Sequence, residues 1–122
     1  MRAILIDPFK REVTQVELTG DRLQEYYKVI ECSTIAMPVI FDNRDSLVID
    51  DEGWFQEYPD GRAGFMMDGW AYAIIGKALI IGCDEEGESV EPKQNDPLYW
   101  RDKIEWKDDS FMTRQGSRMG LI

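Results

Sequence analysis

The chain has 122 residues, which is enough for one domain with a buried core and too few for two ordinary domains. Its 24 acidic residues against 14 basic ones give a net charge of −10. A field of that sign repels nucleic-acid phosphates and anionic membranes, so the composition argues against a protein that binds DNA, RNA or lipid directly.

The cysteines and the first residues indicate the compartment. Cys32 and Cys83 are the two cysteines, and their spacing fits neither a C-x-x-C motif nor a zinc site. The apolar run at residues 3–6 stops at Asp7 and Pro8, and it is far shorter than a secretion signal or a membrane span. We therefore expect a protein of the reducing cytoplasm, with no membrane partner.

The first thirty residues predict a β-hairpin followed by a helix. The strand at 3–6 ends where proline removes a hydrogen-bond donor, and residues 12–18 are rich in β-branched side chains. A capping residue then opens a helix at 21–30, in which apolar side chains recur at spacings of three and four. This helix has an apolar stripe that can pack on a sheet.

The middle of the chain predicts short strands separated by turns. Pro38 makes 34–40 an edge strand or an irregular extended segment, and 46–49 is another short strand. Residues 54–72 are rich in aromatic, glycine and methionine side chains without a clear period, which predicts an insertion-like loop. The most apolar part of the chain, residues 71–75 and 77–81 separated by Gly76, predicts buried strand at the centre of the sheet.

The last third predicts a short helix and a tail. A helix begins at Pro97, after a capping residue, and 104–106 is either its continuation or a last strand. Residues 110–122 contain no acid, and we expect a loosely ordered or partner-dependent arm there. The expected architecture is a single α+β domain at 1–109, with a mixed or antiparallel sheet of about five strands and one main helix packed on one face.

The sequence has no recognisable catalytic machinery. It contains no histidine, the commonest general base and metal ligand, and no phosphate-binding loop, dinucleotide fingerprint or serine-hydrolase motif. Neither cysteine has the histidine or basic neighbour that activates a nucleophile, so both are predicted to be structural thiols. We expect no catalytic residue, no cofactor and no dedicated metal site.

Two turns repeat the pattern of an apolar strand, three acids and a glycine. Their acids are Asp50, Asp51 and Glu52 in the first turn and Asp84, Glu85 and Glu86 in the second. Such turns are often simply solvated. A pair at matching strand ends could also bind Ca²⁺ or Mg²⁺ or act as an acid and a base, although the spacing is not that of an EF-hand.

The second acidic turn continues as far as Glu91 without a basic residue. It could therefore imitate a row of phosphates and occupy the basic groove of another protein, with Trp54 or Trp70 as an anchor. The alternative interpretation is a charged loop that keeps the protein dispersed in water.

Several short motifs together resemble a known family. They are MRAILIDP at 1–8, VTQVE at 13–17, LVIDDEG at 47–53 and GKALIIGCDEEG at 76–87. In order and spacing they are similar to the uncharacterised family of small domains catalogued as domain of unknown function 3846, over roughly residues 1–91. The resemblance implies a protein carried by bacteriophages or other mobile elements, and no known reaction. The aromatic region 54–70 and the acid-free tail depart from simpler members.

The leading hypothesis is a protein that binds and inhibits or modulates a host protein with a basic surface, such as a nucleic-acid-handling restriction or CRISPR enzyme. The expected contact residues are Asp50, Asp51, Glu52, Trp54, Trp70, Asp84, Glu85, Glu86 and Glu88. Two alternatives remain open. One is a binder of a metal-bound nucleotide or signalling molecule held between the two acidic turns, and the other is a homo-oligomer with 54–70 as the interface.

Overall fold

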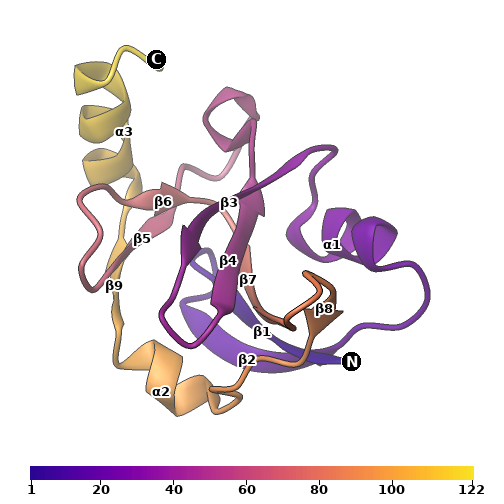
Figure 1. Ribbon diagram of the computed structural model, residues 1–122. Helices are drawn as coiled ribbons and strands as arrows, with labels where there is room; N and C mark the ends of the chain where they lie inside the picture. The colour runs from indigo at the N-terminus through magenta and orange to yellow at the C-terminus, as the bar shows by residue number, and fades with distance from the viewer.

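The computed structural model describes residues 1–122 and is built from short strands, three α-helices and one 3₁₀ turn. In chain order the elements are β1 (Arg2–Asp7), β2 (Glu12–Glu17), α1 (Arg22–Ile30), β3 (Ile35–Ile40), β4 (Asp45–Asp50), η1 (Gly53–Phe55), β5 (Gly64–Met67), β6 (Ile74–Ile75), β7 (Ala78–Cys83), β8 (Ser89–Val90), α2 (Pro97–Arg101), β9 (Ile104–Lys107) and α3 (Asp109–Arg118). Figure 1 shows their arrangement.

Six of the strands form an antiparallel main sheet. Their order is β2-β1-β7-β4-β3, and the short β8 pairs with β7. The predicted α+β class, with a sheet of about five strands and one main helix on a face, is confirmed. β3 lies at an edge, where Pro38 is tolerated because its missing N–H leaves no central-strand hydrogen bond unmade.

β7 is the centre of the main sheet and is buried on both faces. Ala78 and Ile80 belong to the core on one face, and Leu79 and Ile81 belong to the core on the other. A strand that is covered on both faces of the sheet has a continuous apolar sequence, without the alternation of polar and apolar residues. The predicted central strand is therefore confirmed for residues 78–81.

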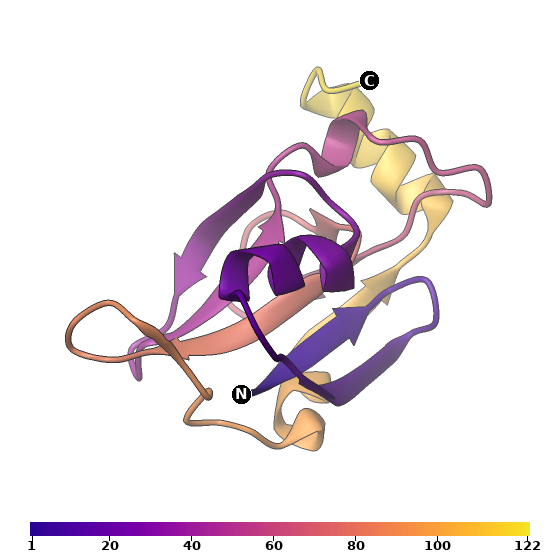
Figure 2. The same cartoon turned by 90° about the vertical axis from the view of Figure 1, so that its right-hand side faces the viewer.

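Helix α1 covers one face of the main sheet. The Asp21 side chain caps its first turn by accepting a hydrogen bond from the Gln24 backbone N–H at 3.1 Å. Tyr26 and Ile30 are buried against the strands, and the helix ends at Glu31, whose φ of 58° is left-handed. Figure 2 looks onto this face, with α1 in front of the sheet. The predicted helix is confirmed.

A second antiparallel sheet, with the order β6-β5-β9, covers the opposite face. It contributes Phe65, Ile74 and Ile104 to a core shared with the main sheet. The prediction of a loop throughout 54–72 is wrong for β5, which pairs with β6 and β9 on its two sides. Most of its residues are buried, so the segment lacks the polar and apolar alternation by which a strand is recognised.

Gly76 divides the apolar segment 71–81 between the two sheets. The preceding residues, Ile74 and Ile75, form β6 in the second sheet, and Ala78 begins β7 in the main sheet. Gly76 has a φ of 81°, which glycine adopts without strain, so the chain can change direction here. The prediction that both runs lie at the centre of one sheet is therefore wrong for residues 71–75, of which Ile74 and Ile75 belong to the second sheet.

The last residues form helix α3, where a loosely ordered tail at 110–122 was expected. The Asp108 carboxylate caps the helix by accepting a hydrogen bond from Phe111 N–H at 2.9 Å. Met112 is fully buried, and the Gln115 amide bonds to both the N–H and the C=O of Ala73, at 3.0 and 2.9 Å. The capping residue Asp108 precedes the acid-free tail, whose own composition carries no helix signal. None of the helices is long and apolar enough to cross a membrane.

Replacing Met112 tests whether α3 is part of the folded unit. Met112→Ala should lower the free energy of unfolding by about 2–4 kcal/mol, because it removes fully buried side-chain atoms from the core under α3. Met119→Ala, at the exposed end of the same helix, should change it by less than about 0.5 kcal/mol. Urea denaturation measures both. Equal stability of Met112→Ala and the unmodified protein would contradict the packing of α3.

Candidate functional site

The two acidic turns lie at opposite ends of the main sheet. They follow β4 and β7, which are antiparallel neighbours with Ile49 opposite Ala78 and Asp45 opposite Gly82. At about 3.3 Å per residue, Asp50 and Asp84 are therefore roughly 20 Å apart along the strands. In Figure 2 the orange β7–β8 hairpin is at the left and the magenta turn after β4 is at the upper right. The hypothesis of one ligand held between the two turns is contradicted by this register.

In the first acidic turn, the Asp50 carboxylate and the Trp54 ring both make contacts within the protein. Asp50 accepts hydrogen bonds from the Glu52 backbone N–H at 2.9 Å and from the Gln56 side-chain amide at 3.2 Å. The Trp54 ring packs against α3 at Gly116, where a β-carbon would overlap it. Trp54 and Trp70 are both half-buried, so neither is the fully exposed anchor expected from the sequence, whereas Asp51 and Glu52 are exposed.

A cleft of about 590 Å³ lies beside the first turn. Asp7 and Asp50 contribute to its wall, together with Lys10, Arg62 and Lys77. Asp7 holds its own turn by accepting hydrogen bonds from two backbone N–H groups at 3.0 and 3.2 Å, and Lys77 is paired with Glu31 at 3.4 Å. Most charges of this cleft thus already have partners within the chain.

The Asp50 carboxylate also contributes to raised pKa values of two neighbouring groups, the Tyr58 hydroxyl and the Cys32 thiol. Burial, followed by the negative charge of Asp50, raises the pKa of the Tyr58 hydroxyl to about 12, and Arg62 opposes the shift. The same two causes, burial first, raise the pKa of the Cys32 thiol to about 11. Both groups hold their protons more tightly in the folded state, so their contribution to stability is complete below their ordinary pKa values and is lost as the pH rises through the raised values.

The second acidic turn presents three carboxylates to solvent. Asp84 is half-buried and accepts hydrogen bonds from the backbone N–H groups of Glu86 and Glu88, both at 2.9 Å. It closes the β7–β8 hairpin, while Glu85, Glu86 and Glu88 are exposed. The Arg44 guanidinium, in the turn between β3 and β4, donates a hydrogen bond to the Asp84 carbonyl at 3.1 Å. This bond joins the β3–β4 turn to the β7–β8 hairpin. We call the three exposed side chains the hairpin glutamates.

Trp70 lies at this same end of the molecule, beside two adjoining cavities of about 340 and 410 Å³. The cavities share Phe41, Asp42, Met67 and Asp68 and together form what we call the aromatic groove. Trp70 lines the larger cavity, and Tyr99, Trp100 and Lys103 line the smaller one. The groove runs between the β3–β4 turn, the β5–β6 connection and α2, and Figure 1 shows the β3–β4 turn beside α2.

A fully buried carboxylate, Asp45, sets the position of α2. Asp45 accepts hydrogen bonds from the backbone N–H groups of Lys93 at 2.8 Å and Gln94 at 3.0 Å, and from the Asn43 amide at 3.1 Å. The Gln94 carbonyl in turn accepts from the Trp100 indole N–H at 2.7 Å. Asp45 falls in the polar stretch between the strands predicted at 34–40 and 46–49, and only its position directly before an apolar strand hints at burial.

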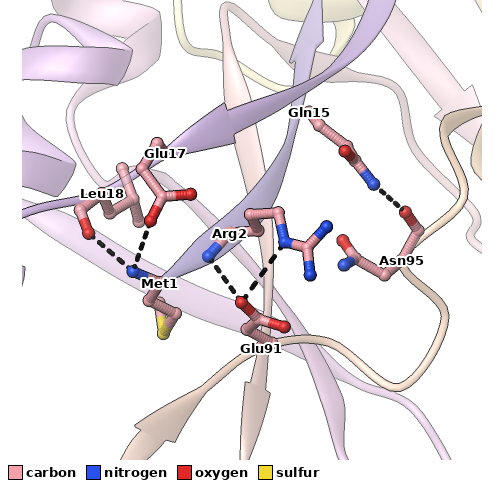
Figure 3. Close-up of polar contacts among 7 residues, drawn as sticks. All are labelled: Met1, Arg2, Gln15, Glu17, Leu18, Glu91 and Asn95. Atoms are coloured by element: carbon pink, nitrogen blue, oxygen red, sulfur yellow. Dashed lines mark hydrogen bonds and ion pairs between the residues drawn. The ribbon is translucent and has the colours of Figure 1, made fainter.

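The segment between β8 and α2 is also tied to the N-terminal hairpin. Figure 3 shows Glu91 accepting from the Arg2 backbone N–H at 3.1 Å and paired with its guanidinium at 3.5 Å, and these contacts lower the pKa of Glu91. In the same view the Gln15 amide donates to the Asn95 carbonyl at 2.6 Å. The segment that leads into α2, the helix of Tyr99 and Trp100, is therefore fixed to both β4 and the N-terminal β1–β2 hairpin.

The fold and these sites define a small antiparallel α+β domain with an aromatic groove and an acidic hairpin at one end. Residues 1–104 match the family described as Domain of unknown function (DUF3846), so the chain belongs to this family. The match extends past the expected limit at residue 91 and includes the aromatic region 54–70, while α3 lies beyond it. No curated protein and no solved structure matches the chain.

Replacing Asp45 tests its role in holding α2. Asp45→Ala should destabilise the protein by about 3 kcal/mol or more, because three donors lose a charged acceptor and the two backbone N–H groups have no other partner. Asp42→Ala, an exposed position in the same turn, should change stability by less than about 0.5 kcal/mol. Thermal unfolding measures the stability of both variants. Equal losses of stability would contradict the role of Asp45 in holding α2.

The reactivity of Cys32 tests the electrostatic effect of Asp50. In a Cys83→Ser background, Asp50→Asn should speed alkylation of Cys32 by iodoacetamide at about pH 8.5 by roughly three-fold to ten-fold, because a lower thiol pKa raises the thiolate fraction. Asp51→Asn removes the same charge from an exposed neighbour and should leave the rate unchanged. Mass spectrometry follows the reaction. An unchanged rate in Asp50→Asn would show that Asp50 does not act on Cys32.

Proposed function

We propose that this protein binds another protein through a basic surface of that partner, and that the hairpin glutamates and the aromatic groove form the contact. The single observation that supports this most is their position together at one end of the fold. The Arg44 hydrogen bond joins the β7–β8 hairpin to the β3–β4 turn, and that turn is one wall of the groove.

The combination suits a protein interface better than a small-molecule site. Interfaces gain most of their affinity from a few aromatic anchors surrounded by a polar rim, and complementary charge at the rim speeds association. Ile40, at the end of β3, is 69% exposed and extends the apolar surface of the groove. The net charge of −10 adds long-range attraction to a basic partner.

The proposal also includes a kind of partner enzyme and a cellular setting. A nucleic-acid-handling enzyme presents the required basic surface, because its cleft is built to hold phosphates. The family resemblance leads us to propose that the protein is carried by a bacteriophage or mobile element and acts in the bacterial cytoplasm. There it would inhibit or modulate such a host enzyme, for example one of a restriction or CRISPR defence system.

The proposed surface is smaller than the set of residues expected from the sequence. It keeps Trp70, Glu85, Glu86 and Glu88, with Asp84 as the residue that shapes the hairpin. The first acidic turn and Trp54 lie outside it, at the opposite end of the sheet. The segment 54–70 also offers less interface than expected, because Phe65 and Met67 lie in the core and Trp54 packs under α3.

Reversing the hairpin charges tests the proposal. The triple variant Glu85→Lys, Glu86→Lys and Glu88→Lys should lose a partner captured from host lysate, with its affinity reduced by at least about a hundred-fold at low salt. The measurement is affinity capture by the unmodified protein, followed by titration of the purified partner against each variant.

The control is Asp51→Lys, Glu52→Lys and Glu57→Lys, which applies the same charge change to exposed residues near the opposite end. It should weaken binding by less than about five-fold, through net charge alone. Equal losses in the two triple variants, or no captured partner, would contradict the proposed surface.

A further inference from the structure

The smaller half of the aromatic groove, of about 340 Å³, is built from rigid rings. The Phe41 and Trp100 centroids are 5.1 Å apart with planes inclined at 49°, and the Tyr99 and Trp100 rings meet edge to face at 5.1 Å. Trp100 is 3% exposed and its indole N–H is held by the Gln94 carbonyl. The rings are therefore preorganised, and a ligand need not order them on binding.

Two carboxylates at this cavity have no partner in the protein. Asp42 and Asp68 both line it, both are exposed, and neither side chain makes a hydrogen bond or an ion pair within the chain. Asp7, Asp45, Asp50 and Asp84 differ, since each accepts backbone hydrogen bonds that hold a turn. Asp42 and Asp68 are not used in this way and remain free to bind a cation.

The cavity already holds one cation of the chain itself. The Lys103 ammonium lies over the Tyr99 ring, 5.2 Å from its centroid. Its backbone is fixed, because the Lys103 carbonyl accepts a hydrogen bond from Asp68 N–H at 2.9 Å. Two carboxylates against one ammonium leave the cavity with one uncompensated negative charge, and a partner cation that displaces the Lys103 ammonium gains the Tyr99 face as well.

We propose that this cavity receives an arginine side chain of the partner protein. The planar guanidinium can stack on an aromatic face while its N–H groups bond to a carboxylate in a forked arrangement, which a lysine ammonium cannot do. The identity of the partner rests on the proposed function, but the chemistry of the cavity does not. It predicts that arginine in a short peptide binds here without the partner.

The experiment uses the full chain and two peptides, acetyl-Gly-Ala-Arg-Ala-Gly-amide and its citrulline analogue, which has nearly the same shape without the charge. Nuclear magnetic resonance titration should show shifts centred on the Trp100 indole N–H and the Asp68 amide. Binding of the arginine peptide should be at least about ten-fold tighter than that of the citrulline peptide. A lysine peptide should bind more weakly than arginine.

Matched variants separate the cavity from general acidity. The pair Asp42→Asn and Asp68→Asn should weaken the arginine peptide by about ten-fold, whereas Glu85→Gln with Glu86→Gln removes the same charge from the hairpin and should change binding by less than about two-fold. Lys103→Gln should tighten binding by a few-fold, because it frees the Tyr99 face. Lys107→Gln, whose ammonium lies over Phe111 elsewhere, should not.

The outcomes are decisive in both directions. Equal binding of arginine and citrulline peptides, equal binding of lysine and arginine, or equal loss in the two double variants would each overturn the arginine site. Because no partner is needed, such a failure is distinct from failure of the proposed function, which is judged by charge reversal of the hairpin glutamates against a captured partner.

Discussion

The structure of the groove depends on the buried carboxylate of Asp45. Taking a carboxylate out of water costs several kcal/mol unless hydrogen bonds replace its hydration, and here two backbone N–H groups and one side-chain amide do so. Through these bonds Asp45, at the start of β4, fixes the backbone of Lys93 and Gln94. The Gln94 carbonyl then accepts a hydrogen bond from the Trp100 indole, and the Trp100 ring packs against Phe41. One charge thereby connects the main sheet, α2 and the β3–β4 turn.

Two groups of carboxylates in this acidic chain have different roles. Asp7, Asp45, Asp50 and Asp84 accept hydrogen bonds from backbone N–H groups and determine the shape of turns. The hairpin glutamates, with Asp42 and Asp68, make no such bonds and face solvent. The short aspartate side chain reaches its own backbone easily, which explains why aspartates supply the first group. Net charge alone does not separate the two.

The sequence predicted the elements whose signals are local. Helix α1 has a capping aspartate and an apolar stripe, and β7 is an apolar run bounded by glycines, so both were found. β5 has no recognisable sequence signal because most of its residues are buried and it lacks alternation, and the signal of α3 is its Asp108 cap, which lies before the acid-free tail. The separation of the acidic turns follows from the antiparallel pairing of β4 with β7, which similar local motifs cannot reveal. Asp45 was missed because burial of a single aspartate has no sequence period.

Helix α3 has a consequence for how the fold can vary. Gln115 bonds to the backbone of Ala73, which directly follows the turn bearing Asp68 and Trp70, yet the helix lies beyond the residues that match the family. The main sheet makes none of its strand pairs with this helix. Residues outside the family match therefore support one wall of the groove, although none of them lines it.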